Sequence, residues 1–275
     1  MQKEGVMNSP IINNRAFAKP HEMAALLKQD LSSFIIRLFQ ELNLQTPYLH
    51  NWYVDLIASK LTGVADGEIK RLIINIPPRN LKSICASVAF PAWLLRHYPS
   101  KKVICASYAQ DLAIKHASDC RLLMFSPWYQ ETFPNTKLSA ARTATHDFNT
   151  TQKGGRMAVS TGGGITDRGA DILIIDDPLK PDEATSDVTQ NNVNDWFDGT
   201  AYTRLDSKKD GAIIINMQRL HLDDLVGYVK EKGGWDIVNL PAIAEETEIY
   251  SFSTFAGEMR VTRHQAFRYM AHVNH

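Results

Sequence analysis

The chain has 275 residues, 44% of them apolar, which is enough to bury the core of one large domain or of two small ones. Thirty basic residues balance thirty acidic ones, so net charge makes no case for nucleic acid or membrane, although a local basic patch is compatible with it. No stretch approaches the roughly 20 apolar residues of a membrane helix, and the first twenty residues hold no signal-peptide core. The three separate cysteines form no CxxC pair. These features favour a cytoplasmic protein with buried free thiols.

Apolar residues recur at helical spacing in some segments and form continuous runs in others. The predicted helices span, in chain order, residues 21–43, 49–64, 83–99, 109–126, 188–205 and 222–233. The predicted strands span residues 71–77, 101–108, 155–164, 170–178, 211–219 and 235–243. We expect the third helix to bend or break at Pro91. Alternating strands and helices predict an α/β fold with a mostly parallel central sheet and helices on both faces.

Polar residues follow three of the predicted strands. They are "PPRNLKS" at 77–83, "DDP" at 176–178 and "QRLHLDD" at 218–224. In mostly parallel sheets, ligands bind beyond the carboxyl ends of the strands. We therefore expect these three segments to meet at one edge of the sheet.

The first segment fits the second half of a phosphate-binding loop. Backbone N–H groups of Arg79, Asn80 and Leu81 could hold phosphate oxygens at the start of a helix. Lys82 would place its charge at the β- and γ-phosphates, and Ser83 would bind Mg²⁺. Leu81 stands where such loops normally have glycine, a residue used for unusual backbone dihedral angles. A plain strand, turn and helix is therefore the alternative.

Four apolar residues precede the Asp176–Asp177 pair, as in a Walker B strand. Asp176 would bind Mg²⁺, while Asp177 or the nearby Glu183 would orient the attacking water. Two adjacent ionised aspartates repel each other, and a cation would offset the repulsion. An ordinary Asp-Asp-Pro turn is the alternative, but its pairing with "RNLKS", about 95 residues earlier, favours an NTPase.

Two arginines and one aromatic residue are further candidates. Arg79 or Arg168 could add positive charge in a phosphoryl-transfer transition state. Trp52 lies upstream of the loop and could stack on adenine, although packing in the core is an alternative.

The segment at 218–224 also allows two interpretations. Gln218, Arg219 and His221 could form a polar sensor beside the γ-phosphate. Metal binding by His221 with Asp223 is conceivable, but its spacing is not diagnostic, and a helix N-terminus is simpler.

Five segments carry a family resemblance when they are taken in order: "INIPPRNLKSI", "VICASYAQDLA", "GGGITDRGADILIIDDPLK", "MQRLHLDDL" and "GGWDIVNLPAIAEE". Together they resemble the ATPase part of the large terminase subunit of tailed bacteriophages and prophages. In that family the phosphate loop often reads Pro-Pro-Arg-x-x-Lys-Ser. The resemblance implies a P-loop NTPase fold and a motor that uses ATP and Mg²⁺ to move double-stranded DNA, independently of sequence. It also implies a portal protein, a small terminase subunit and a homo-oligomeric ring as partners, in the cytoplasm of a bacterial host.

The resemblance also assigns roles to residues. Lys82 and Ser83 would hold phosphate and Mg²⁺, and Asp176 would be the Walker B carboxylate. Asp177 stands where such a motor usually has a catalytic Glu, with Glu183 as the fallback. The coupling segment, more often Thr-Arg-Trp-His in the family, would contain Gln218, Arg219 and His221.

The same resemblance suggests a division of the chain. Residues 1–44 would form a helical N-terminal lead-in, residues 45–247 the P-loop ATPase domain, and residues 248–275 a truncated remnant of the linker toward a missing nuclease domain. We therefore expect no DNA cleavage. Two alternatives stay open: a helicase-like nucleic-acid-dependent ATPase outside packaging, and an inactive prophage remnant that serves as an interaction module at most.

Overall fold

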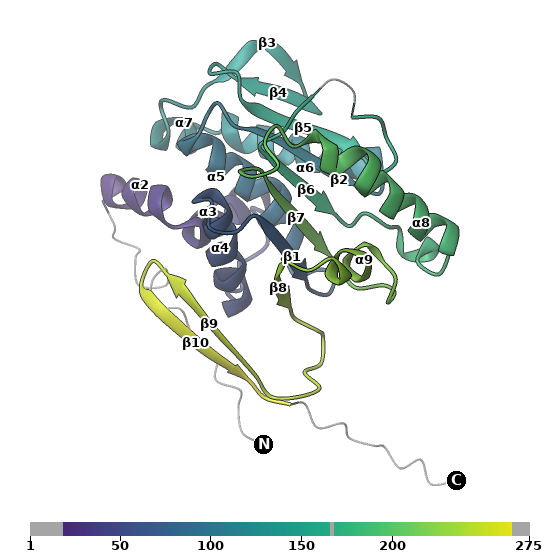
Figure 1. Cartoon of the computed structure of the whole chain (residues 1–275). Coiled ribbons are helices and arrows are strands. Elements are labelled where there is room, and N and C mark those ends of the chain that lie inside the picture. Colours follow the sequence, from purple (N-terminus) through teal and green to yellow (C-terminus); the bar gives the residue numbers. More distant parts are fainter. Residues whose placement is uncertain (1–18, 166–167, 266–275) are drawn as a thin grey trace.

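The computed structural model describes residues 19–165 and 168–265 (Figure 1). The start of the predicted lead-in, Asp167 in the glycine-rich segment, and the end of the predicted linker remnant lie outside the described residues. Within these ranges, no helix is both long enough and apolar enough to cross a membrane.

Helices and strands alternate along most of the chain (Figure 1). The α-helices are α2 (Pro20–Gln29), α3 (Leu31–Leu42), α4 (Trp52–Ala65), α5 (Phe90–His97), α6 (Gln110–Phe125), α7 (Pro127–Thr132), α8 (Asp187–Trp196) and α9 (Leu225–Glu231). The strands are β1 (Arg71–Asn75), β2 (Lys102–Ser107), β3 (Leu138–Ala144), β4 (Asp147–Thr150), β5 (Gly155–Ser160), β6 (Ile172–Asp176), β7 (Ala212–Met217), β8 (Asp236–Asn239), β9 (Glu248–Thr254) and β10 (Gly257–Arg263). Shorter π and 3-10 turns are η1 (Ile84–Ala89), η2 (Pro181–Glu183), η3 (Phe197–Ala201) and η4 (Tyr202–Arg204).

Eight of the strands form one sheet in the order β3-β4-β5-β2-β6-β7-β1-β8. Strands β5, β2, β6, β7, β1 and β8 pair with one another in parallel, and β4 pairs antiparallel with both β3 and β5. Strand β7 lies between β1 and β6, so the loop after β1 and the aspartates after β6 are one strand apart at the same edge. The prediction of an α/β fold with a mostly parallel sheet is confirmed.

Helices cover both faces of the sheet because its central strands are apolar on both sides. Leu72 and Ile74 of β1 pack into the core beneath α3, α4, η1, α5 and α6. Ile73, between them, points into the second core beneath α8 and α9. Each fully buried side chain of this kind contributes about 1.5 to 3 kcal/mol. Helix α3 belongs to the first core, since Phe34 and Leu38 are completely buried.

The structure differs from the sequence prediction at element boundaries. The helix predicted over 21–43 divides at Asp30, whose extended backbone and side chain begin α3. The helix around Pro91 does not break there: a π-helical turn, η1, precedes it, and Pro91 lies in the first turn of α5. Pro91 has no N–H to give to the Ser87 carbonyl four residues earlier, and buried Arg156 donates to that oxygen at 3.2 Å instead. Helix α7, strands β3 and β4, and the β9–β10 hairpin were not predicted.

Replacing Asp30 tests the division between α2 and α3. Its carboxylate accepts a hydrogen bond from the Ser33 backbone N–H at 2.9 Å. We expect Asp30→Ala to lower the free energy of unfolding by about 1 kcal/mol, measured by urea denaturation, because this N-cap is lost. Asp30→Asn keeps an acceptor oxygen and should retain most of the stability. Equal losses in the two variants would contradict the capping role.

Candidate functional site

The loop after β1 takes the backbone shape that its sequence makes unusual. Arg79 and Leu81 both have positive φ, at 65° and 59°, the left-handed conformation that glycine adopts more readily. The Asn80 side-chain amide donates to the carbonyls of Pro77 and Pro78, at 3.1 Å each, and holds the loop. Leu81 thus adopts the glycine-like conformation, and its partly buried side chain packs against the core.

Asp176, at the end of β6, is a carboxylate that accepts three side-chain hydrogen bonds. It is 1% exposed. Its Oδ1 accepts from the Ser83 hydroxyl at 3.0 Å and the Asn216 amide at 2.6 Å, and its Oδ2 accepts from the Ser87 hydroxyl at 2.7 Å. The Nδ1 atom of buried His116 lies 3.5 Å from Oδ2. Groups from η1, the residue before it, α6 and β7 thus converge on one carboxyl group.

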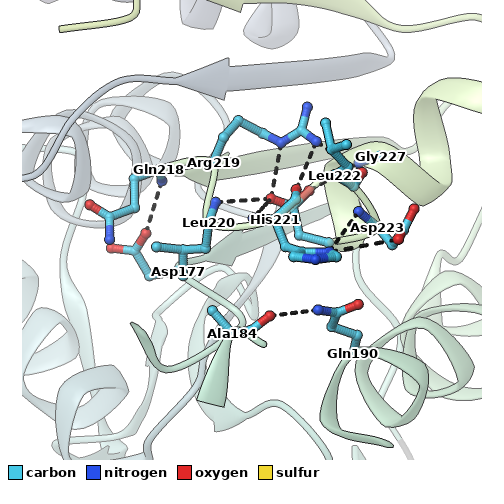
Figure 2. Close-up of polar contacts among 11 residues, drawn as sticks. Asp177, Ala184, Gln190, Gln218, Arg219, Leu220, His221, Leu222, Asp223 and Gly227 are labelled. Atoms are coloured by element: carbon cyan, nitrogen blue, oxygen red, sulfur yellow. Dashed lines mark hydrogen bonds and ion pairs between the residues drawn. The ribbon is translucent and has the colours of Figure 1, made fainter. Parts of the chain in front are cut away.

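Asp177 joins two of the polar segments. Its carboxylate forms an ion pair with the ammonium of Lys82, which is only 6% exposed. Its other oxygen accepts from the Gln218 backbone N–H at 3.3 Å (Figure 2). The backbone of Asp177 is held on both sides, by the Asn216 carbonyl at 2.8 Å and the Tyr108 N–H at 3.0 Å. The structure therefore brings Lys82, Ser83 and both aspartates together, as the sequence predicts.

Burial dominates the electrostatics of this edge. It raises the pKa of Asp176, and Lys82 and the three hydrogen bonds oppose the shift. Burial and repulsion from Asp176 raise the pKa of Asp177, again opposed by Lys82. Burial, with help from Arg156, lowers the pKa of His116 to about 4, so this side chain is neutral at pH 7. One ammonium faces two carboxyl groups, an arrangement that a further cation would stabilise.

The site's oxygen donors fit magnesium. The Ser83 hydroxyl oxygen and the Asp176 carboxylate oxygen are hard ligands that lie 3.0 Å apart. The side-chain oxygen of buried Asn216 has no hydrogen-bond partner among the described residues. Within residues 19–165 and 168–265, no group of three or more His, Cys, Asp or Glu could hold a metal by itself. Mg²⁺ is usually bound by one or two protein groups together with waters and phosphates, and the Ser83 hydroxyl and the Asp176 carboxylate are groups of that kind.

The segment at 218–224 is organised by Asp224, which is completely buried. Its Oδ2 accepts from Arg219 Nε at 2.9 Å and the Leu220 N–H at 3.1 Å, and its Oδ1 accepts from the Gly227 N–H at 3.0 Å, capping α9. Arg219 also donates to the carbonyl of His221 at 2.9 Å. The Arg219 guanidinium is thus bonded within its own segment. The segment contacts Asp177 through the backbone N–H of Gln218.

Some predicted residues lie apart from this cluster. Glu183 is exposed in η2, and the following turn is held by Gln190, which donates to the Ala184 carbonyl (Figure 2). Arg79 is exposed at the tip of its loop. The ring of Trp52 packs against the core and lies 5.2 Å from that of Tyr250 in β9.

The structure contradicts the prediction that Arg168 adds positive charge to the phosphoryl-transfer site of its own subunit. It precedes β6, so it lies at the amino edge of the sheet, whereas Asp176 ends the same strand at the carboxyl edge. Its guanidinium donates two hydrogen bonds of 2.6 Å to Asp147 of β4. The sequence places Arg168 close to the aspartates along the chain, but the length of the strand separates them in space.

Sequence reasoning missed Ser87, His116 and Asn216. Asn216 carried a signal, because it is a polar residue in the otherwise apolar run of β7, beside the strand of the aspartates. Ser87 and His116 lie on helices and gave none.

Two cavities are lined by residues away from this edge. The larger, about 750 Å³, is bordered by α3, α4 and the β9–β10 hairpin. The smaller, about 240 Å³, is lined from β2, β3, β4, β5 and the segment before β6.

No protein-family model matches the chain, and no curated protein matches it. Among solved structures, its fold is similar to that of the large terminase of bacteriophage HK97, at 13% sequence identity and a TM-score of 0.46. The similarity covers 78% of this chain and 44% of that protein. The chain therefore spans less than half the length of that terminase.

The backbone of Arg79 offers a test of the loop. A left-handed non-glycine residue costs about 1 to 2 kcal/mol, and the entropy of glycine offsets about 0.5 to 1 kcal/mol of it. We therefore expect Arg79→Gly to raise the free energy of unfolding by up to about 1 kcal/mol. Arg79→Ala keeps the left-handed cost and should leave stability unchanged. Chemical denaturation of both variants measures the difference, and a less stable glycine variant would refute this backbone assignment.

Proposed function

We propose that the chain is the ATP-hydrolysing motor domain of a phage DNA-packaging large terminase subunit. One observation carries the proposal. Lys82 and Ser83 contact Asp177 and Asp176, although 95 and 93 residues separate the partners. A plain strand–turn–helix unit does not require a buried ammonium and a hydroxyl to contact two carboxyl groups at the end of another strand. A nucleotide site needs these groups together.

The loop and the helix after it would hold the phosphates. Backbone N–H groups of Arg79, Asn80 and Leu81 precede a helix N-terminus, where partial positive charge favours anions. Lys82 would exchange Asp177 for phosphate oxygens. Ser83 and Asp176 would hold Mg²⁺, which neutralises charge on the phosphates when it is bound.

Asp177 is the proposed base that orients the attacking water. Burial and Asp176 raise its pKa, which suits a group that accepts a proton. Release from Lys82 would free one of its oxygens, while the other stays within reach of the Gln218 N–H. Glu183 is less suited, because it is exposed in η2.

The same contact supports a coupling role for residues 218–224. A change at Asp177 reaches Gln218 directly, and the next residue, Arg219, is tied to Asp224 at the start of α9. His221 accepts from the Asp223 N–H at 3.2 Å in the same turn. We propose that nucleotide exchange at Lys82 moves this segment and that Trp52 contacts the adenine from α4. Double-stranded DNA, a portal protein, a small terminase subunit and a homo-oligomeric ring are the proposed partners.

Replacing Lys82 tests the assignment. Lys82→Met keeps most of the side-chain volume and removes the charge, so we expect ATP turnover to fall by on the order of 10² or more, because the phosphates lose their main stabilising cation. Phosphate release by the purified protein measures this. Lys115→Met removes an exposed lysine whose ion-pair partner among the described residues is Asp119, and it should leave turnover unchanged. Undiminished turnover by Lys82→Met, or none by the unaltered protein, would end the proposal.

Asp177 and Glu183 can be separated by amide substitution. Asp177→Asn should abolish turnover, because the base is lost, yet nucleotide binding should persist or tighten, because Lys82 no longer has a competing carboxylate. Glu183→Gln should change turnover by less than about twofold, since an exposed residue that contacts no reacting group contributes little. Turnover and the binding of a fluorescent ATP analogue are measured on both variants. Loss of turnover in Glu183→Gln alone would reverse the assignment.

A further inference from the structure

All charged residues that line the smaller cavity in the described structure are basic. Its volume is about 240 Å³, and it lies at the amino ends of β2, β5 and the segment leading to β6. Four of its lining residues are basic and reach the surface; we call them the basic face: Lys102, Arg142, Lys153 and Arg168. Neither a carboxylate nor an aromatic residue is among the lining residues of the described chain. Net charge over the whole chain is zero, so this is a local excess.

Two carboxylates bordering the cavity orient three of these cations. Asp147 receives the bidentate bonds of Arg168 and lies 3.3 Å from Arg142, while Asp206 pairs with Lys102 at 3.0 Å. Lys153 has no ion pair with any residue that the structure describes. Four positive charges against two negative ones leave an excess of two. The Lys102 and Arg142 side chains are about half exposed, so their ion pairs are weak and exchangeable.

The chemistry of this surface selects its ligand. Positively charged and concave surfaces concentrate anions. Proteins that grip single-stranded nucleic acid stack its bases on aromatic side chains, and this lining offers none. Contacts from Lys and Arg to phosphate need no access to the bases and carry no sequence preference. The lining therefore suits the backbone of a duplex, whose bases stay paired and stacked inside.

We propose that the basic face binds the phosphate backbone of duplex DNA. The choice of DNA rests on the proposed motor function, whereas the surface is identified by its own charge and shape. Arg168 would anchor the face through Asp147, with Lys102, Arg142 and Lys153 in contact with phosphates. The face and the Lys82 site then lie at opposite ends of β6, so DNA binding does not obstruct nucleotide.

A charge-neutralised triple variant tests this surface in the full chain. Lys102→Gln, Arg142→Gln and Lys153→Gln are combined, and binding of a fluorescent duplex of about 30 base pairs is followed by anisotropy without nucleotide, over a range of salt. We expect affinity to fall about tenfold or more and the salt slope to drop by about 2 to 3, at about 0.9 per lost phosphate contact. Arg168 is left intact because its bonds to Asp147 join two parts of the fold.

The matched control removes three charges elsewhere. Lys115→Gln and Lys232→Gln break exposed ion pairs, as two of the test substitutions do, and Lys28→Gln of α2 removes an exposed lysine without one in the described chain. The control should bind within about twofold of the unaltered protein.

Equal losses in both triples, an unaffected basic-face variant, or single-stranded DNA that binds as tightly as the duplex would each overturn the inference. DNA-independent ATP turnover of the basic-face variant should stay unchanged. A protein without ATPase activity that still shows this pattern would refute the proposed function and leave the DNA surface standing.

Discussion

The carboxyl edge of the sheet depends on the burial of Asp176. A carboxylate without solvent costs several kcal/mol unless donors satisfy it. Here Ser83 and Ser87, at the start of the helix after β1, and Asn216 of β7 provide them. Meeting this requirement pins the first turns of the helix after β1 against the ends of β6 and β7. The ion pair of Lys82 with Asp177 follows from that arrangement.

Asp177 connects the loop after β1 to the segment after β7. Its positive φ of 45° turns the chain immediately after β6, so that one carboxylate reaches both Lys82 and the backbone of Gln218. The two consecutive aspartates thus differ: both carboxylate oxygens of Asp176 accept hydrogen bonds from buried side chains, whereas Asp177 pairs with Lys82 and can exchange that partner. Buried Asp224 then holds the segment at 218–224 in place through Arg219, so the polar residues after β7 form a compact unit rather than a loose loop.

Leu81 shows why a glycine pattern is an incomplete guide to such loops. What the loop needs is a left-handed backbone, and a non-glycine residue can supply it at a cost of about 1 to 2 kcal/mol. Packing of the Leu81 side chain against the core and the bonds of Asn80 to two carbonyls offset that cost. Local rules are expected to fail at functional sites, where the surrounding structure can hold a strained conformation.

The sequence by itself determined the alternation of helices and strands and the grouping of Lys82, Ser83, Asp176 and Asp177, because periodicity is local and the ends of parallel strands share an edge. Tertiary structure alone decided which other residues join them. Ser87, His116 and Asn216 reach Asp176 because β7 lies between β1 and β6 and because η1 and α6 cover that face, and strand order is a long-range property. It also decided against Arg168, which is near the aspartates in the chain but lies a full strand length away, since the side chains at the two ends of an extended strand cannot meet.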